Sequence, residues 1–401
     1  SAGLETLNSY FNGSDGDLPI LDPVSSDKFV VDHKNVNDIS KTNLSGKAYK
    51  GDISGWPGGM NGKEVLASMI ARSSEVDGGY DATHGYDYAQ LVSKFAMGGI
   101  FYHQACDNYL DEKLEANNKP NNKPYKDGAY YTGKEHSWDE AYGYWGAAAH
   151  GLTVSAKANY EIAKRGKKSK SPEAALKLAD YNKDGVVDLY REYNFGHSYY
   201  AAAYDKGGKT SYYNNIQKAF IYGRNVITKA DGKKLTDVER GKLRSIARSI
   251  ELNWQRVIAE SIFKYAGSVY KDLEKLNVIL EANGNSDKVF RKYAKHWGEL
   301  KGFAMALQTG KSNIGEVAVK LNRMIGFGPV LPNGSQVVDI DSNGDFIKDQ
   351  GQTMSEYMLH MLKIQRLMVE KYGVKARVND KLAGLEGLMK KVGKGDSAEN
   401  D

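Results

Sequence analysis

The sequence predicts an all-α fold made of two pseudo-symmetric helical bundles that arose by internal duplication. Three observations lead to this prediction: one motif occurs twice, apolar residues recur at three- and four-residue spacing, and no convincing strand-like alternation exceeds a few residues. The motif begins at Trp138 and again at Trp297, with Trp, Glu and Gly in register. At the same offset, without a gap, Asp180 matches Asp339. A unit this long indicates a duplicated half-domain rather than a solenoid repeat.

The chain is expected to contain four parts, joined by long acidic and glycine-rich loops. These are an irregular N-terminal segment at 1–62, a first helical half-repeat at 63–215, a second at 216–392, and a polar tail at 393–401. Apolar spacing predicts helices at 64–73, 86–117, 137–165, 172–179, 216–228, 237–282, 286–309, 314–325 and 353–372. Since 237–282 is too long for one ordinary helix, Gly267 is the expected break.

The composition suits a soluble globular protein with a sizeable core. Of the 401 residues, 41% are hydrophobic and 26% charged, and the net charge is only +5. No nucleic-acid motif is present, and no stretch approaches the roughly 20 apolar residues of a spanning helix. We therefore expect neither a nucleic-acid partner nor a transmembrane segment. Abundant Tyr and Gly, and small residues where the chain starts, favour a periplasmic, cell-surface or extracellular location.

Two acidic loops with glycine lie at the repeat offset and suggest calcium. Ca²⁺ takes six to eight oxygen ligands, and glycine at the sixth loop position permits the sharp turn. The candidate calcium ligands are Asp180, Asn182, Asp184 and Asp188 in the first loop, and Asp339, Asp341, Asn343 and Asp345 in the second. Arg191 stands at position twelve, where a bidentate Glu is usual, so a weak site is expected. The alternative is an ordinary turn, because Asp, Asn and Gly are also turn residues.

Each repeat also carries a helix with His and Glu on one side. His136 with Glu140, and His296 with Glu299, are four and three residues apart and can present a nitrogen and a carboxylate together. Such a pair is a candidate ligand set for iron or another transition metal. The alternative is a structural His–Glu pair on a helix whose Trp packs in the core.

These helices resemble the imelysin-like family of bacterial envelope proteins, and a nearby uncharacterised family of secreted or lipoprotein helical domains. The resemblance rests on residues 135–143, on 220–224, and on His296 and Glu299 with Phe303. The family signature is Gly-x-His-x-x-Glu; here Ala294 replaces its Gly, and His136 has one extra residue before Glu. The resemblance extends in style over 65–375. It implies a duplicated helical bundle with a role related to iron acquisition.

The sequence therefore supports a non-catalytic, secreted or envelope-associated metal-binding protein with calcium-stabilised loops. The alternative is a calcium-braced structural surface protein that self-assembles as a homo-oligomer or ordered layer. A hydrolase is a more distant alternative, because standard catalytic motifs are absent. Enzymatic activity is left open, with a non-catalytic role favoured.

Overall fold

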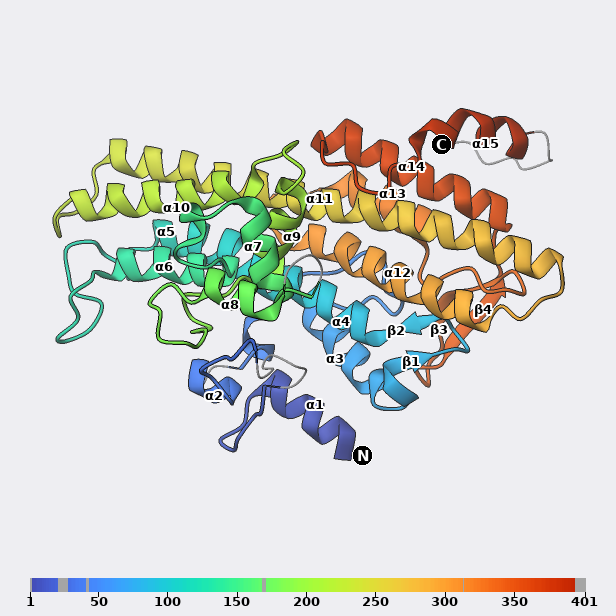
Figure 1. The fold of residues 1–401 in the computed structure, drawn as a ribbon, viewed down its shortest axis with the longest axis horizontal. Helices are drawn as coiled ribbons and strands as arrows, with labels where there is room; N and C mark the ends of the chain where they lie inside the picture. Colours follow the sequence, from blue (N-terminus) through green and yellow to red (C-terminus); the bar gives the residue numbers. More distant parts are fainter. Residues whose placement is uncertain (1, 21–27, 41–42, 168–170, 313, 394–401) are drawn as a thin grey trace. The chain divides into compact units, whose positions relative to one another are not determined.

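Most of the chain is helical, which confirms the all-α class (Figure 1). The computed structural model describes residues 2–20, 28–40, 43–167, 171–312 and 314–393. The α-helices are α1 (Ala2–Asn12), α2 (Val36–Ile39), α3 (Gly62–Ser73), α4 (Tyr88–Ala96), α5 (Lys113–Glu115), α6 (Gly133–Trp145), α7 (Ala156–Lys164), α8 (Pro172–Ala179), α9 (Gly196–Asp205), α10 (Tyr212–Lys229), α11 (Asp237–Glu281), α12 (Asp287–Ala306), α13 (Gly315–Ile325), α14 (Met354–Tyr372) and α15 (Leu385–Val392).

Shorter elements complete the described residues. A π-helix, η3 (Met97–Glu112), continues α4 into α5. The 3₁₀ turns are η1 (Ser45–Lys47), η2 (Asp77–Gly79), η4 (Gly151–Thr153), η5 (Leu307–Thr309) and η6 (Leu382–Gly384). Two antiparallel hairpins pair β1 (Tyr80–Asp81) with β2 (Tyr86–Asp87), and β3 (Ser335–Ile340) with β4 (Phe346–Gln350). In the described part of the chain, no helix is both long and apolar enough to span a membrane.

The chain folds into two compact units, neither of which is contiguous in sequence. The first unit contains Tyr49–Gly99 and the residues from Ile258 onward, with the first residues of the chain; the second contains Glu5–Ala48 and Ile100–Val257. The boundaries fall inside the π-helix that follows α4 and inside α11. The bounds of these units do not coincide with the two half-repeats that the sequence predicts at 63–215 and 216–392.

In the first unit, α12 packs along α4. Gly302 permits this close packing, because a Cβ there would lie 2.6 Å from the Cβ of Lys94. The buried Trp297 indole donates its Nε1–H to the Tyr357 hydroxyl at 2.8 Å, and that hydroxyl donates to the Ile325 carbonyl at 2.6 Å. These bonds satisfy the polar atoms of two aromatic side chains inside the core.

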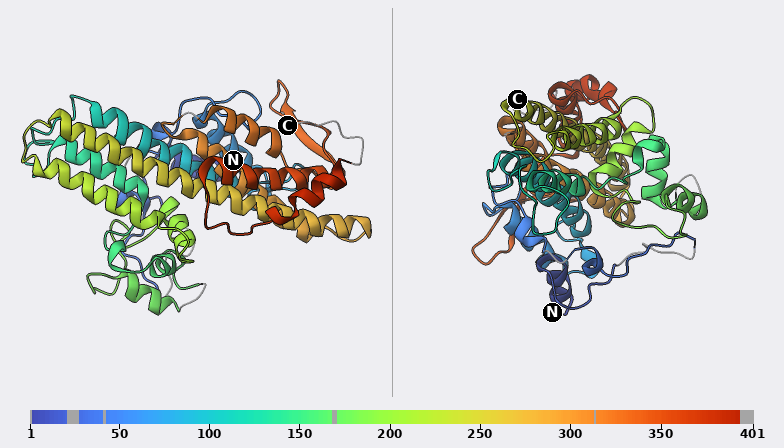
Figure 2. Two further views of the ribbon diagram at one scale, coloured as in Figure 1. Left: turned by 90° about the horizontal axis from the view of Figure 1, so that it is seen from above. Right: turned by 90° about the vertical axis from the view of Figure 1, so that its left-hand side faces the viewer.

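In the second unit, α6 lies beside α10 (Figure 2). Trp138 of α6 donates its Nε1–H to the Phe220 carbonyl of α10 at 2.8 Å. Gly223 lets the indole approach, because a Cβ there would lie 2.0 Å from Trp138. A separate apolar cluster joins α7 and α8 to the N-terminal segment through Phe29, Val31, Ile162, Ala175, Ala179 and Val187.

Several sequence-based expectations about helix bounds are wrong. The predicted helix 86–117 begins only at Tyr88, after β2, and becomes a π-helix at Met97. The predicted helix 137–165 ends at Trp145, because Gly146 adopts a left-handed conformation (φ 74°), and α7 starts only after the N-cap Ser155. Gly267 does not break α11, which runs without interruption. Its missing side chain instead admits another segment, since a Cβ would lie 2.0 Å from the carbonyl oxygen of Asn379.

Candidate functional site

The first acidic loop, 180–188, turns its side-chain oxygens onto its own backbone. Asp180 accepts hydrogen bonds from the N–H groups of Asp184 at 3.1 Å and Gly185 at 3.0 Å. Asn182 Oδ1 also accepts from the Asp184 N–H, at 3.0 Å. Gly185 has a φ of 92°, which favours glycine at the turn. Side-chain oxygens from positions one and three of the predicted calcium loop therefore gather inside one turn, with Asp184 at position five beside them.

Two further carboxylates close this loop. Glu192 accepts from the N–H groups of Tyr181 at 2.9 Å, Asn182 at 3.1 Å and Asp188 at 3.0 Å. Asp188 instead pairs with Arg191, whose Nη2 lies 2.6 Å from its Oδ2. Burial acts to raise the pKa of Asp188, but Arg191 and a backbone N–H outweigh it and lower that pKa. Glu192, one residue beyond position twelve, thus holds the loop together.

The loop is also tied to the N-terminal segment. Val187 donates its N–H to the Val30 carbonyl at 2.9 Å, and Asp32 donates to the Val187 carbonyl at 3.1 Å. Val31 and Val187 pair as a parallel bridge and pack in the same apolar cluster. The loop is therefore anchored near its C-terminal end on a buried residue.

The second acidic loop has a different backbone. Asp339 lies within β3 and accepts from the neighbouring Ile340 N–H at 2.8 Å. Asp341 accepts from the N–H groups of Asn343 at 2.8 Å and Asp345 at 2.9 Å, which closes the β3–β4 hairpin. The first loop follows a helix, whereas the second joins two strands, so the two equivalent sequence patterns have different local structures.

His136 and Glu140 meet on α6. The His136 Nε2 lies 3.2 Å from the Glu140 Oε1. The imidazole also stacks on Tyr125, with ring centroids 3.7 Å apart. Burial lowers the pKa of His136, against the pull of Glu140. The pair is thus a partly exposed histidine–carboxylate contact with one face of the imidazole covered by an aromatic ring.

His296 contacts a different carboxylate from the one the sequence suggested. Its Nδ1 lies 2.5 Å from Asp272 Oδ2 on α11, and Asp272 is 2% exposed. Glu299 is also buried, at 8% exposed, and forms no hydrogen bond or ion pair with the described residues. The structure therefore orients His296 from α11 rather than from its own helix.

Across the described ranges, no three His, Cys, Asp or Glu side chains converge closely enough to hold a metal ion. Both His/Glu pairs would need additional ligands to complete a metal site.

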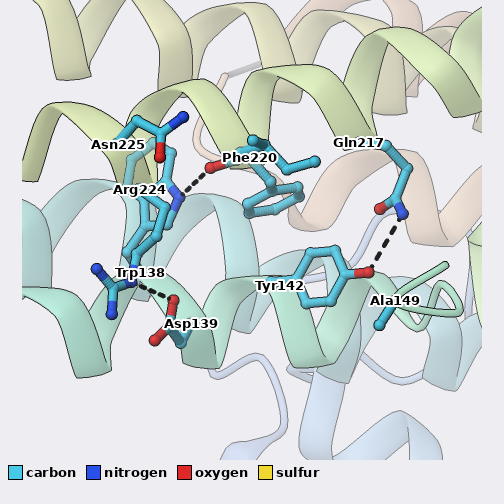
Figure 3. A pocket seen from close by; sticks show the side chains of 9 residues that line it. Trp138, Asp139, Tyr142, Ala149, Gln217, Phe220, Arg224 and Asn225 are labelled. Carbon is cyan, nitrogen blue, oxygen red and sulfur yellow. Dashed lines mark hydrogen bonds and ion pairs between the residues drawn. The ribbon is translucent and has the colours of Figure 1, made fainter. Parts of the chain in front are cut away.

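A pocket of about 270 Å³ opens between α6 and α10 in the second unit (Figure 3). Asp139 and Tyr142 project into it from α6, and Gln217 and Phe220 from α10. The aromatic rings supply an apolar wall. The polar side chains lie at its two ends.

Arg224 holds one end of the pocket. Its Nε donates to Asp139 at 2.9 Å, and its Nη1 donates to Glu135 at 2.6 Å and to the Thr228 hydroxyl. Burial raises the pKa of Asp139, although Arg224 opposes this. For Glu135, burial also acts upward, but the Thr132 N–H and Arg224 outweigh it and lower the pKa.

Gln217 holds the other end. It is 1% exposed, and its Nε2 donates to the Tyr142 hydroxyl and to the Ala148 carbonyl, each at 3.2 Å. The carbonyl accepts only, so the amide nitrogen must face it. The Gln217 Oε1 is buried and has no hydrogen-bond partner among the described residues.

Residues 53–175 match the family model described as "Domain of unknown function (DUF4856)". The match includes all of α6, with His136, Asp139 and Glu140, and ends before Asp180 and before α10. No curated protein and no solved structure matches the chain.

Sequence reasoning did not find the pocket between α6 and α10. One signal was available: Gln217, Phe220, Ile221 and Arg224 recur at three- and four-residue spacing and so share one face of a helix. That spacing predicts a common face. It does not reveal that α6 lies opposite.

Proposed function

We propose that this chain is a non-catalytic helical protein of the cell envelope or exterior whose 180–192 loop binds calcium. The observation that supports this proposal is a turn in which Asp180 and Asn182 accept hydrogen bonds from loop N–H groups and the Asn182 amide donates to the Asp184 carboxylate, with Gly185 at the sixth position. Side-chain oxygens at positions one, three and five are the first ligands of such a loop.

The expected affinity follows from position twelve. Arg191 cannot coordinate a cation, and Glu192 is engaged with three backbone N–H groups. A loop without the bidentate Glu should have a Kd of roughly 10⁻⁴ to 10⁻³ M, the range of extracellular modules. Such a site fills where calcium is abundant, which supports an exterior location.

Calcium titration by calorimetry and thermal unfolding tests the proposal. At about 10 mM Ca²⁺, binding in this affinity range should stabilise the protein by about 1.4–2.7 kcal/mol. Asp180→Ala should remove the effect of calcium. The control is Asp127→Ala, in an exposed turn outside both acidic loops, which should keep it. An unfolding temperature that calcium does not change in the wild-type protein would exclude the proposal.

A second candidate function is transition-metal binding at His296. Asp272 holds the Nδ1 of this ring, and a carboxylate bonded to one ring nitrogen commonly orients a metal-binding histidine. Glu299, buried without a partner among the described residues, lies one turn away. The resemblance to imelysin-like proteins points to iron.

Elemental analysis of the isolated protein separates the candidates. Iron, copper or zinc that is lost in His296→Ala, but retained in His136→Ala, would support the second. Calcium alone, with a native mass that increases with calcium, would favour a self-assembling surface protein instead.

A further inference from the structure

The pocket between α6 and α10 has a charge balance that disfavours anions. Arg224 supplies the positive charge, but Asp139 and Glu135 both accept hydrogen bonds from its guanidinium. Two carboxylates around one guanidinium leave a surplus of negative charge at that end. An anionic ligand would have to displace one of these carboxylates, whereas a hydrogen-bond donor would not.

The opposite end offers an acceptor without a donor. A buried oxygen that lacks a hydrogen bond costs about 1–3 kcal/mol, and native proteins keep few of them. The Gln217 Oε1 cannot exchange places with Nε2, because the nitrogen is required by the Ala148 carbonyl. In Figure 3 this side chain descends from α10 toward the pocket. A ligand hydroxyl or N–H that reaches this oxygen would satisfy it.

Between the two ends lies an apolar wall formed by Phe220 and Tyr142 (Figure 3). Their ring centroids are 5.5 Å apart with planes at 80°. Aromatic faces carry partial negative charge and favour contact with the weakly positive C–H groups of a ring. The volume of about 270 Å³ lies just below the range of roughly 300–1,000 Å³ for drug-sized ligands. The space suits a single substituted ring.

We propose that this pocket binds a small neutral sugar or a similar hydroxylated ring. Hydroxyl groups at opposite sides of the ring donate to Gln217 Oε1 and to the carboxylate of Asp139. The C–H face of the ring packs against Phe220. A neutral polyol supplies donors at both ends without disturbing the Arg224 ion pairs.

Saturation-transfer NMR on the full chain tests this proposal with methyl glycosides of glucose and mannose and with N-acetylglucosamine, each at millimolar concentration. Sodium acetate and ethylammonium chloride serve as anionic and cationic probes. At least one sugar should receive saturation, and acetate should not. The proposal is overturned if no sugar binds, or if ethylammonium binds more tightly than every sugar.

Two neighbouring residues of α10 give a matched pair of variants. Ile221 lines the pocket and is 49% exposed, so Ile221→Trp should fill the space and abolish sugar binding without altering the core. Tyr222 is 56% exposed and does not line the pocket, so Tyr222→Trp should leave binding unchanged. Binding that survives Ile221→Trp would place the sugar elsewhere and contradict the proposal.

Gln217→Leu removes the unpartnered acceptor and should weaken sugar binding by about three- to tenfold, the loss of one hydrogen bond. Far-ultraviolet circular dichroism and the unfolding temperature establish that this variant folds. If it does not fold, the Ile221 and Tyr222 pair still decides the question.

Discussion

Lys301 is a lysine whose side chain is buried in the core of the first unit. It is 1% exposed, and its Nζ donates to the Gly326 carbonyl at 2.6 Å. A Cβ on Gly55 would lie 2.8 Å from this Nζ and 3.2 Å from the Asn322 Oδ1, so glycine is required beside it. Burial lowers the pKa of Lys301 to about 7. The amine therefore lies in a poorly solvating site and donates to a neutral carbonyl.

This burial makes stability depend on pH. The folded pKa of about 7 lies below the ordinary value of 10.5, so between these values the unfolded chain binds more protons. The free energy of unfolding should therefore rise with pH from 7 to 10, by up to about 1.4 kcal/mol per pH unit. Lys301→Met should remove this contribution to the slope.

Urea unfolding at pH 7, 8 and 9 measures the slope. The control is Lys295→Met, an exposed lysine on the same helix, which should preserve it. Equal slopes in wild-type protein and Lys301→Met would contradict a neutral buried amine.

At the scale of elements, α11 serves as a support for the chain that follows α14. Glu260 accepts hydrogen bonds from the N–H groups of Lys375, Ala376 and Arg377, at 2.6, 2.7 and 3.0 Å. Gln365 of α14 donates to the Asn379 carbonyl at 3.0 Å. The extended segment is thereby held against the helix, and a glycine in the helix gives it room.

Glycine-to-alanine changes in α11 should have opposite effects at two positions. Gly267→Ala should destabilise the protein by about 1–3 kcal/mol, because the new Cβ would collide with the Asn379 backbone. Gly241→Ala should stabilise it by about 0.5–1 kcal/mol, because that position is open and alanine favours helix. Chemical denaturation of both variants measures the difference. Stabilisation of both variants would show that the backbone at Asn379 moves away from the new Cβ at little cost, and would contradict the prediction.

The sequence predicted the elements whose signals are local. Residues 172–179 form α8 as expected, between the N-cap Ser171 and the C-cap Asp180. The β3–β4 hairpin was missed because β4 is almost entirely exposed and shows no alternation of apolar residues. The pocket was missed because its walls come from helices about eighty residues apart. The burial of Lys301 could not be predicted either, because the spacing of apolar residues does not show how much of the surface of α12 is covered by other helices.

At the scale of the whole molecule, each unit is built from separate stretches of the chain, and only the first unit includes residues after Val257. The first unit combines Tyr49–Gly99 with the residues after Ile258, and α11 contributes to both units without a break. Helix formation is cooperative along an uninterrupted segment. We therefore expect the two units to unfold together.

Arg256→Pro tests this coupling. Arg256 is exposed and lies beside the unit boundary at Val257, so proline there breaks α11 without removing a buried side chain. The break should cost about 3 kcal/mol or more. Calorimetry should show one transition for the wild-type protein and for Arg256→Ala, and two for Arg256→Pro. Two transitions in the wild-type protein would refute the coupling.

The bridge between Val31 and Val187 makes the acidic loop a clasp for the start of the second unit. Because Val187 exchanges backbone hydrogen bonds with Val30 and Asp32, we expect an event that loosens the loop also to release this segment. Phe29 and Val31 would then be accessible to a protease, so resistance of this segment to cleavage would indicate that the loop is closed. Closure of the acidic loop would thereby protect an apolar segment about 150 residues earlier in the chain from proteolysis.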